Sequence, residues 1–402
     1  MSFFSRNLKG VFPAPVQKSP DALRFGILGA AKVAPIAFII PAISHPEVIV
    51  AAIACRGKSK GKKFGKSHSI PTVYTGPNAY QQLIDDPSID AVYNPLPNNL
   101  HYEWTIKALR AGKHVLLEKP SSDVKSDTVA MFDLAEEKGL ILLEAFHYRF
   151  HPSVQRVKAI LDSGELGAIK SINAELCLTK GAIPSNNIRY EYELGGGGFM
   201  DGGGYVVSVS RYLMGGNPTS VVSAQPTSVY RKDPRIDDGI TAVLAFPGDK
   251  TAEVTCNIQL AGWGPFGIIP RLPRLRFTVT AEGGTIHLNQ FVVPHIYHSI
   301  TVKPTSKPTR VEKHYVHPQG SGAEQTGEAW WSTYRYQLEA FVDKVKSRTP
   351  QAWFDAQDSI DNVEWIENIY KKVGFLLFWG RLRSLNQHSE WTGQSACRDL
   401  GR

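Results

Sequence analysis

Apolar and polar positions alternate in short blocks over the first third of the chain. Five apolar runs predict buried strands, at residues 23–28, 48–55, 91–94, 114–118 and 141–144. Residues 102–111 and 126–138, which lie between such runs, have helix-like patterns. Because regular strand–helix alternation buries a parallel sheet between layers of helices, the pattern predicts a doubly wound domain over residues 22–150.

The pattern changes after Pro152. A helix to about residue 161 is followed by five runs that predict a larger sheet, at residues 221–227, 241–246, 252–260, 276–280 and 285–288. Turn signals at residues 247–249 and 282–284 indicate hairpins, and residues 359–373 predict a closing helix. The sequence therefore predicts an α/β protein whose second, α+β domain at residues 151–380 carries a large open, mostly antiparallel sheet.

Length and composition agree with two ordinary globular domains. The 402 residues are 42% hydrophobic and 20% charged, which excludes a disordered, collagenous or coiled-coil chain. No apolar run approaches the roughly 18 residues that span a bilayer. The four cysteines form no C-x-x-C pair, so no disulfide or zinc framework is expected. We predict a cytoplasmic protein with a flexible N-terminal arm at residues 1–21 and a C-terminal tail at residues 381–402.

A basic run follows the second predicted strand. The formal net charge is +8, and six basic residues fall between positions 56 and 66. Such a run fits a solvated helix face, a nucleic-acid patch or a site for an anionic cofactor. It lacks the interleaved aromatic residues typical of nucleic-acid binding. Residues 61–67 also have one residue too few between their glycines for a phosphate-binding P-loop.

The first predicted strand runs into a tight turn, Gly29-Ala30-Ala31, and then into a predicted helix start. This is the order of a dinucleotide-binding Rossmann unit, in which the turn binds the pyrophosphate. Ala31 replaces the middle glycine of the fingerprint, so a turn without a ligand stays an alternative. Arg56 and Lys58 follow the second strand where an acid would bind the ribose of NAD. A guanidinium and an ammonium suit the 2′-phosphate of NADP, so NADP is favoured over NAD.

Two further motifs carry side chains suited to chemistry. Glu118-Lys119-Pro120 ends the predicted strand at residues 114–118, at the edge where parallel sheets bind ligands. Lys119 is either a salt-bridged strand terminus or a group for proton or electrostatic work. The glycine-rich residues 195–204 lead into an apolar periodic run, unlike a linker. A helix that begins near Asp201 places Asp201 and Tyr205 one turn apart, and this pairing suits proton transfer.

Histidines at positions 147 and 151 have the spacing of a metal-binding pair. No third ligand is recognisable, so no metal is predicted. His147 and Arg149 are expected to line the site instead.

Together these motifs resemble the Gfo/Idh/MocA oxidoreductase family over roughly residues 22–378. The resemblance rests on their order and spacing, at residues 29–31, 96–101, 118–120, 144–152 and 195–205. The chain is most similar to the branch of NADP-dependent D-xylose 1-dehydrogenase and trans-1,2-dihydrodiol dehydrogenase, in which a tyrosine stands four residues after the aspartate. Tyr205 matches that pattern.

The resemblance implies roles for individual residues. Lys119 would lie beside the nicotinamide and help Tyr205 to ionise, Asp201 would orient the substrate, and Tyr205 would be the acid–base. The implied cofactor contacts are Gly29, Ala31, Lys32, Val33, Arg56, Lys58, Leu96, Asn98, His101, Glu118 and Lys119. The implied substrate contacts are His147, Arg149, Asp201 and Tyr205. A homodimer paired through the open sheet is also implied, with Trp330 and Trp331 either in that contact or in the core.

The predicted function is NADP-dependent hydride transfer to or from a carbinol or hemiacetal carbon of a sugar or related cyclic polyol. Two alternatives stay open, namely reduction of a carbonyl in a secondary metabolite and a non-catalytic NADP-binding sensor. Neither a nucleic acid nor a membrane is expected as a partner. Three glycines, at positions 202–204, stand where the family has one fixed glycine. A softer helix start and a roomier site are therefore expected, and the exact substrate does not transfer from the family.

Overall fold

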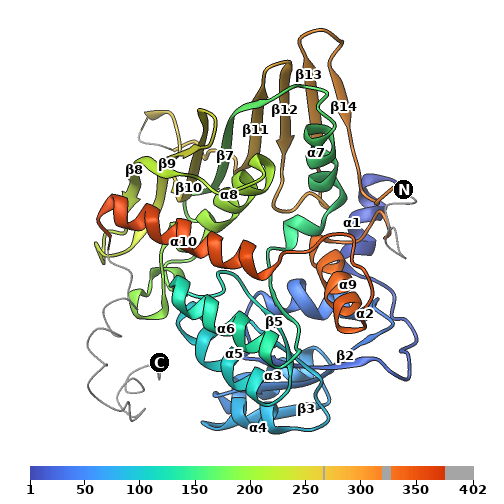
Figure 1. Cartoon of the computed structure of the whole chain (residues 1–402). Helices are drawn as coiled ribbons and strands as arrows, with labels where there is room; N and C mark the ends of the chain where they lie inside the picture. The colour runs from blue at the N-terminus through green and yellow to red at the C-terminus, as the bar shows by residue number, and fades with distance from the viewer. Residues whose placement is uncertain (266–267, 319–326, 376–402) are drawn as a thin grey trace.

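Two sheets and their helices make up the protein (Figure 1). The computed structural model describes residues 1–265, 268–318 and 327–375. Helix α10 (Ala356–Val373) crosses the boundary between the two sheets and packs on helices of both parts. The predicted C-terminal tail at residues 381–402 lies outside the described residues.

The first sheet has six parallel strands in the order β3-β2-β1-β4-β5-β6. The strands are β1 (Leu23–Leu28), β2 (Val48–Cys55), β3 (Thr72–Thr75), β4 (Ala91–Asn94), β5 (His114–Leu117) and β6 (Leu142–Glu144). The doubly wound sheet is thus confirmed, and only the short, half-exposed β3 was not predicted. The strand order reverses between β1 and β4, and such a switch point opens a crevice at the carboxyl ends of the strands.

Helices cover both faces of this sheet. One face packs on α4 (Ala79–Asp85), α5 (His101–Arg110) and α6 (Lys125–Glu137). The other face packs on η1 (Pro35–Ile39), α2 (Ile40–Ile43), α3 (Lys58–Ser67) and the late helix α9 (Thr333–Val345). The Phe25 ring lies 4.8 Å from that of Phe38 and 5.6 Å from that of Phe341, measured between centroids. A helix from the end of the chain therefore completes the first domain.

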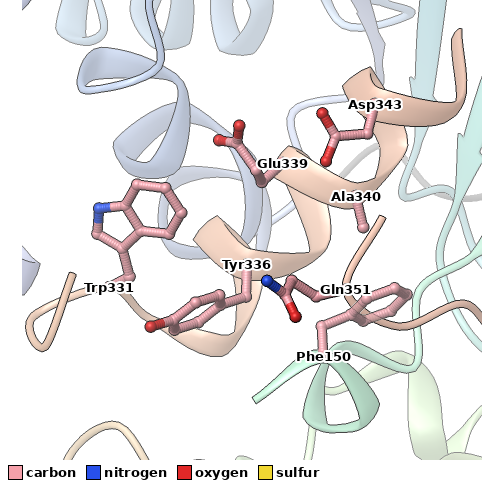
Figure 2. A pocket seen from close by; sticks show the side chains of 7 residues that line it. All are labelled: Phe150, Trp331, Tyr336, Glu339, Ala340, Asp343 and Gln351. Atoms are coloured by element: carbon pink, nitrogen blue, oxygen red, sulfur yellow. The ribbon is translucent and has the colours of Figure 1, made fainter. Parts of the chain in front are cut away.

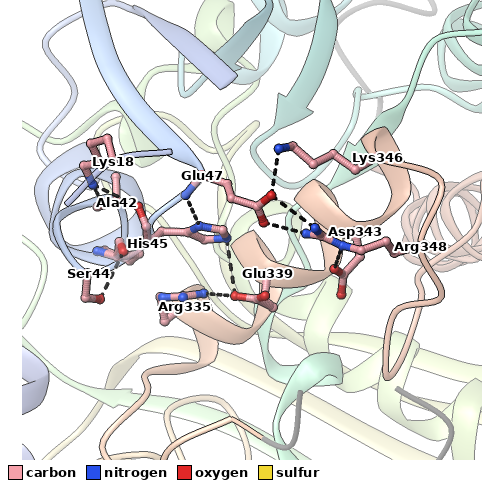
Figure 3. A network of polar contacts seen from close by, with 11 residues as sticks. Lys18, Ala42, Ser44, His45, Glu47, Arg335, Glu339, Asp343, Lys346 and Arg348 are labelled. Carbon is pink, nitrogen blue, oxygen red and sulfur yellow. Dashed lines mark hydrogen bonds and ion pairs between the residues drawn. The ribbon is translucent and has the colours of Figure 1, made fainter. Parts of the chain in front are cut away.

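Charged side chains reinforce the docking of α9 (Figure 3). Glu47, just before β2, accepts hydrogen bonds from Lys346 and Arg348, each at 2.7 Å. His45 Nε2 lies 3.3 Å from the Glu339 carboxylate on α9. The hydrogen bond from Arg348, with help from Lys346, outweighs burial and lowers the pKa of Glu47 to about 2. Glu47 is therefore ionised at neutral pH and joins the two parts of the chain.

Replacing Glu47 by glutamine is expected to lower the free energy of unfolding by about 2 kcal/mol at pH 7. A depressed carboxyl pKa stabilises the fold above the unfolded pKa, near 4.5, and this stabilisation is lost as the pH falls towards 2. Urea unfolding of parent and variant should therefore differ most at pH 7 and converge as the pH is lowered from 5 to 3. The exposed Glu136→Gln is the matched control, and a pH-independent difference for Glu47→Gln would contradict the assignment.

The second sheet has eight strands in the order β14-β13-β12-β11-β7-β10-β9-β8. They are β7 (Ile169–Thr179), β8 (Ser220–Val229), β9 (Asp237–Phe246), β10 (Lys250–Leu260), β11 (Arg274–Ala281), β12 (Gly284–Asn289), β13 (Ser299–Pro304) and β14 (Arg310–Glu312). Only β7 and β10 pair in parallel, so the mostly antiparallel sheet and both predicted hairpins are confirmed. The central strand β7 was not predicted, although its residues alternate between apolar and polar.

Helices lie on one face of the second sheet. Helix α7 (Pro152–Asp162) and helix α8 (Gly198–Met214) stand in front of it in Figure 1, and α8 packs on β7, β9 and β10. Strand residues on the opposite face, such as Asn173, Glu253 and Arg276, are exposed. One face of this sheet is therefore core and the other is polar surface.

The prediction of a flexible N-terminal arm is wrong for its first part. Residues Phe3–Val11 form helix α1, which is capped by the Ser2 hydroxyl and packs beside the second domain. Arg6 is buried, donates to the carbonyl of Ile296 at 2.8 Å and lies 3.5 Å from the Tyr315 ring centroid. These contacts offset the desolvation of the guanidinium and fix the helix.

Candidate active site

Three charged side chains meet between the two domains. Lys119 follows β5, Asp201 lies in the first turn of α8, and Arg189 belongs to the short helix η4 (Ile188–Tyr190). The Lys119 ammonium donates to one Asp201 carboxylate oxygen and to its backbone carbonyl, each at 2.8 Å. Arg189 Nε lies 2.6 Å from the other carboxylate oxygen. Lys119 and Asp201, which were predicted separately as site residues, thus meet in space, and Arg189 is an additional partner of Asp201.

The Lys119 and Arg189 cations keep the Asp201 carboxyl ionised. Burial raises the pKa of the carboxyl, but the Arg189 guanidinium and the Lys119 ammonium outweigh burial and hold it well below its usual range. Asp201 is therefore a permanent anion that fixes the position of both cations. Together the three groups carry a net charge of +1, which suits a site for an electron-rich oxygen.

The glycines that follow Asp201 serve close packing. A Cβ atom on Gly202 would lie 2.6 Å from the Cys256 sulfur, and one on Gly203 would lie 2.5 Å from the Phe199 ring. Side chains thus fill the space around the start of α8. The expectation of a roomier site at these glycines is wrong, because helix and sheet approach each other closely there.

Tyr205 lies one turn after Asp201, as predicted. Lys119 Nζ lies 5.3 Å from the centroid of its ring, and the hydroxyl lies 2.9 Å from His147 Nε2. Burial, with smaller contributions from Tyr334 and Glu118, raises the pKa of the phenol well above its usual value. The expectation that Lys119 promotes ionisation of Tyr205 is not met, because Lys119 faces Asp201. Tyr205 therefore holds its proton at neutral pH.

The turn after β1 has the shape of a dinucleotide site. Gly29 has a φ of 82°, and a Cβ atom there would lie 2.9 Å from the Leu96 side chain. Only glycine fits this left-handed position without strain. The following residues Ala31, Lys32 and Val33 continue the turn to η1, so their backbone lies at the carboxyl end of β1.

Basic side chains lie at the end of β2. Arg56 is exposed and interacts with the Tyr80 hydroxyl, and that hydroxyl would lie 3.7 Å from a Cβ atom on Gly29. Lys58 is exposed in the first turn of α3. Arg56 and Lys58 thus stand beside the turn where the 2′-phosphate of NADP would need them, so the donor set fits this cofactor.

Several other predicted cofactor residues have polar contacts within the protein. Glu118 is buried and accepts a hydrogen bond from Tyr93 at 2.7 Å, and Asn98 donates to the carbonyl of Gly195 at 2.9 Å. The ring nitrogens of His101 each lie 2.7 Å from a backbone carbonyl, of Leu96 or of Pro120. The direct cofactor contact predicted for His101 is therefore not supported, because both ring nitrogens face backbone carbonyls of the protein and one of them donates. Its ring instead joins the segments after β4 and β5.

The prediction that Arg149 lines the substrate site is wrong. Its guanidinium lies 3.6 Å from the Tyr212 ring centroid and 3.4 Å from an Asp358 carboxylate oxygen. The side chain is buried between α8 and α10 and faces neither Lys119 nor Asp201. Arg149 therefore stabilises the packing of the two helices.

Two parts of the site could not be found from the sequence motifs. Arg189 stands in an irregular segment with no recognisable pattern. Thr333 and Tyr334 begin α9, far along the chain, yet the Thr333 hydroxyl lies 2.8 Å from His147 Nδ1 and the Tyr334 ring centroid lies 4.0 Å from that of His147. Only the docking of α9 on the first domain brings them to Tyr205.

A separate pocket borders α9 (Figure 2). It is lined by Phe150, Trp331, Tyr336, Glu339, Ala340, Asp343 and Gln351. None of these residues belongs to the Lys119–Asp201 cluster. Within the described ranges, no group of three or more metal-ligating side chains could hold an ion.

Comparisons with known proteins agree with this geometry. Residues 23–146 match the model of an oxidoreductase family with an NAD-binding Rossmann fold, and residues 154–287 match the model of a GFO/IDH/MocA C-terminal domain. The chain is 33% identical to D-xylose 1-dehydrogenase (NADP(+)) 2 of Haloferax volcanii over 354 residues, which are 87% of this chain and 97% of the relative. It is 29% identical to trans-1,2-dihydrobenzene-1,2-diol dehydrogenase of Bos taurus, over 59% of this chain and 69% of the relative.

Solved structures show the same fold. A 3-ketoreductase from Actinomadura kijaniata, in complex with NADP and TDP-benzene, has a TM-score of 0.72 and 25% identity over 88% of this chain and 98% of its own. Aldose-aldose oxidoreductase from Caulobacter crescentus has the same TM-score at 24% identity, with the same coverage. The two family models, matched in this order, and the relative that is 33% identical over 97% of its own length establish that the chain belongs to the Gfo/Idh/MocA family of oxidoreductases.

Proposed function

We propose that the protein is an NADP-dependent oxidoreductase that acts on a carbinol or hemiacetal carbon of a sugar or related cyclic polyol. The observation that carries this proposal is the meeting of Lys119, Asp201 and Tyr205 at the carboxyl end of β5, the same edge of the sheet as the turn after β1. The D-xylose and dihydrodiol dehydrogenases among its relatives support the substrate class. A non-catalytic sensor has no need of this proton-transfer set.

Each residue of the site has a distinct role in the proposal. Bound NADP would supply the hydride acceptor or donor. Lys119, held by Asp201, would stabilise negative charge on the substrate oxygen, and Asp201 would orient a neighbouring hydroxyl. Tyr205 would exchange a proton with the reacting oxygen. Glu118 and the turn at Gly29 would position the cofactor, and His147 would hold the Tyr205 hydroxyl.

The direct test is turnover on a panel of aldoses and cyclic polyols with NADP⁺, followed by the absorbance of NADPH. Oxidation of D-xylose or a related aldose supports the proposal. NADP binding measured by calorimetry, without turnover on any substrate in either direction, would move the assignment to a sensor.

Carbonyl reduction is the second candidate. Because Tyr205 is protonated at neutral pH, it can donate a proton to the oxygen of a carbonyl group whose carbon accepts a hydride. The structural relative from Actinomadura kijaniata is a 3-ketoreductase. Rates with NADPH and a keto sugar, set against rates with NADP⁺ and the aldose, decide between the two directions.

Replacing Arg56 by alanine is expected to weaken NADP binding by about 10- to 100-fold, as the loss of a charge-assisted hydrogen bond implies. The binding of NAD, which lacks the 2′-phosphate, should change by less than about twofold. Isothermal titration with each cofactor measures both constants. Lys66→Ala, on the exposed end of α3, is the control for loss of charge alone. Equal losses for NADP and NAD would place Arg56 away from the phosphate.

We also propose a cytoplasmic homodimer paired through the polar face of the second sheet. That face carries exposed residues on neighbouring strands, which a second copy could cover. Trp330 and Trp331 are buried within the chain, so they belong to the core and not to such a contact. No helix in the described part of the chain is long and apolar enough to cross a membrane. Sedimentation as a monomer at micromolar concentration would refute the dimer.

A further inference from the structure

A line of hydrogen-bonding groups leads away from Tyr205. Its hydroxyl lies 2.9 Å from His147 Nε2, and His147 Nδ1 lies 2.8 Å from the Thr333 hydroxyl. That hydroxyl in turn lies 3.4 Å from His295 Nδ1, the longest link in the series. Tyr205, His147 and Thr333 are buried, whereas His295 is partly exposed. The series therefore runs from the active site to the surface.

One backbone group fixes the direction of every hydrogen bond in the series. The backbone N–H of Thr333 donates to His295 Nδ1 at 3.3 Å, so this nitrogen carries no proton. The Thr333 hydroxyl must then donate to His295 Nδ1 and accept from His147 Nδ1–H. His147 Nε2 is left as an acceptor, and the Tyr205 hydroxyl donates to it. Each group in the series therefore donates its hydrogen bond to the next group, in the direction from Tyr205 to His295.

The environment keeps both imidazoles neutral, as this arrangement requires. Burial, together with His295 and Lys119, lowers the pKa of His147 well below its usual value. Burial and the Arg6 guanidinium on α1 lower the pKa of His295 to about 3. A neutral imidazole can accept a proton on one nitrogen while it releases one from the other. Neither ring is therefore trapped as a cation at neutral pH.

We propose that His147, Thr333 and His295 form a proton relay that connects the Tyr205 hydroxyl with solvent beside α1. This inference rests on the proposed function. It explains how a phenol that holds its proton can nevertheless act as a base. These three residues act on the reaction only through the Tyr205 hydroxyl.

The transfer balances with one proton in and one proton out. Oxidation of an alcohol by NADP⁺ releases one proton from the substrate hydroxyl. In the relay, the Tyr205 proton passes to His147 Nε2, the His147 Nδ1 proton passes to Thr333, and the Thr333 hydroxyl proton passes to His295 Nδ1. His295 Nε2 then releases its proton to solvent, and Tyr205 is free to accept the substrate proton. Reduction reverses these transfers and starts from the opposite tautomers, in which His147 carries its proton on Nε2 and His295 carries it on Nδ1.

The first test needs neither substrate nor cofactor. Nitrogen NMR of histidine-labelled protein, assigned with His147→Gln and His295→Gln variants, reports the tautomer of each ring. We expect His147 to carry its proton on Nδ1 and His295 to carry it on Nε2. Either ring in the opposite tautomer would overturn the relay, whatever the outcome of the substrate panel. Failure of the panel alone would contradict the proposed function and not this arrangement.

The second test is kinetic, with NADP⁺ and D-xylose as the probe. Thr333→Val removes the hydroxyl but keeps the β-branched shape, whereas Thr333→Ser keeps the hydroxyl. We expect kcat to fall at least about tenfold in Thr333→Val, with a larger solvent deuterium isotope effect, and to stay within about threefold in Thr333→Ser. NADP affinity should be unchanged in both variants. Equal kcat values for the valine and serine variants, at unchanged thermal stability, would overturn the relay.

Discussion

Replacing Tyr205 by phenylalanine is expected to lower kcat by about 100- to 10,000-fold, which is the usual contribution of a general acid or base. The loss follows from the position of Tyr205, whose ring centroid lies 5.3 Å from Lys119 Nζ and whose hydroxyl lies 2.9 Å from His147 Nε2. Phenylalanine keeps the ring and its packing against Phe146. The dissociation constant of NADP should therefore change by less than about twofold. Steady-state rates with the best substrate of the panel, together with calorimetry, measure both quantities.

Tyr148→Phe is the matched control for this experiment. Tyr148 is buried, its ring centroid lies 5.8 Å from that of Tyr205, and its hydroxyl lies 2.7 Å from that of Ser208. Loss of the Tyr148 hydroxyl removes this hydrogen bond, so the free energy of unfolding should fall by about 1 kcal/mol while kcat stays nearly unchanged. If Tyr205→Phe behaved like this control, another group would be the acid–base.

Replacing Lys119 by methionine is expected to lower kcat by about 100- to 1,000-fold, because the variant loses the fixed cation that we propose to stabilise the reacting oxygen. Methionine preserves much of the side-chain volume. Arg189 still contacts Asp201 at 2.6 Å, so the carboxylate should stay ionised in the variant. The KM should change less than kcat, since the charge on the substrate oxygen develops in the transition state. Initial rates over a range of substrate concentrations separate the two constants.

Lys113→Met controls for the loss of a buried lysine. The Lys113 ammonium donates to the carbonyls of Asp86 and Ile89 at 2.9 and 2.7 Å, so its role is structural. This variant should be less stable and have the parental kcat at a temperature where it is folded. A Lys119→Met enzyme with normal kcat and only a raised KM would restrict Lys119 to substrate binding.

Much of the fold could be predicted because buried strands and amphipathic helices leave periodic patterns. Strands β1, β2 and β4 begin and end where predicted, since their short apolar runs are bounded by polar or turn residues. Helix α1 was missed because its stability depends on the contacts of Arg6 with Ile296 and Tyr315, which lie about 290 and 310 positions further along the chain. Long-range contacts of this kind leave no local pattern.

The residues of the site also differ in whether a local sequence pattern predicts them. Lys119, Asp201 and Tyr205 stand in motifs with a local reason, namely the end of a parallel strand and one turn of a helix. Arg149 stands beside His147 in the chain but faces away from the site, because neighbouring residues of the helical segment η3 (His147–Phe150) point in different directions.

The sequence by itself thus determined the two domains, the turn at Gly29, the basic residues after β2 and the positions of the side chains that we propose to be catalytic. These features depend on residue type and spacing over a few turns or strands. Only the tertiary structure decided the electrostatics of the site. Arg189 reaches Asp201 from an irregular segment, and the docking of α9 delivers Thr333 to His147, so the ionisation of Asp201 and the hydrogen bonds of Tyr205 depend on burial and on partners distant in sequence.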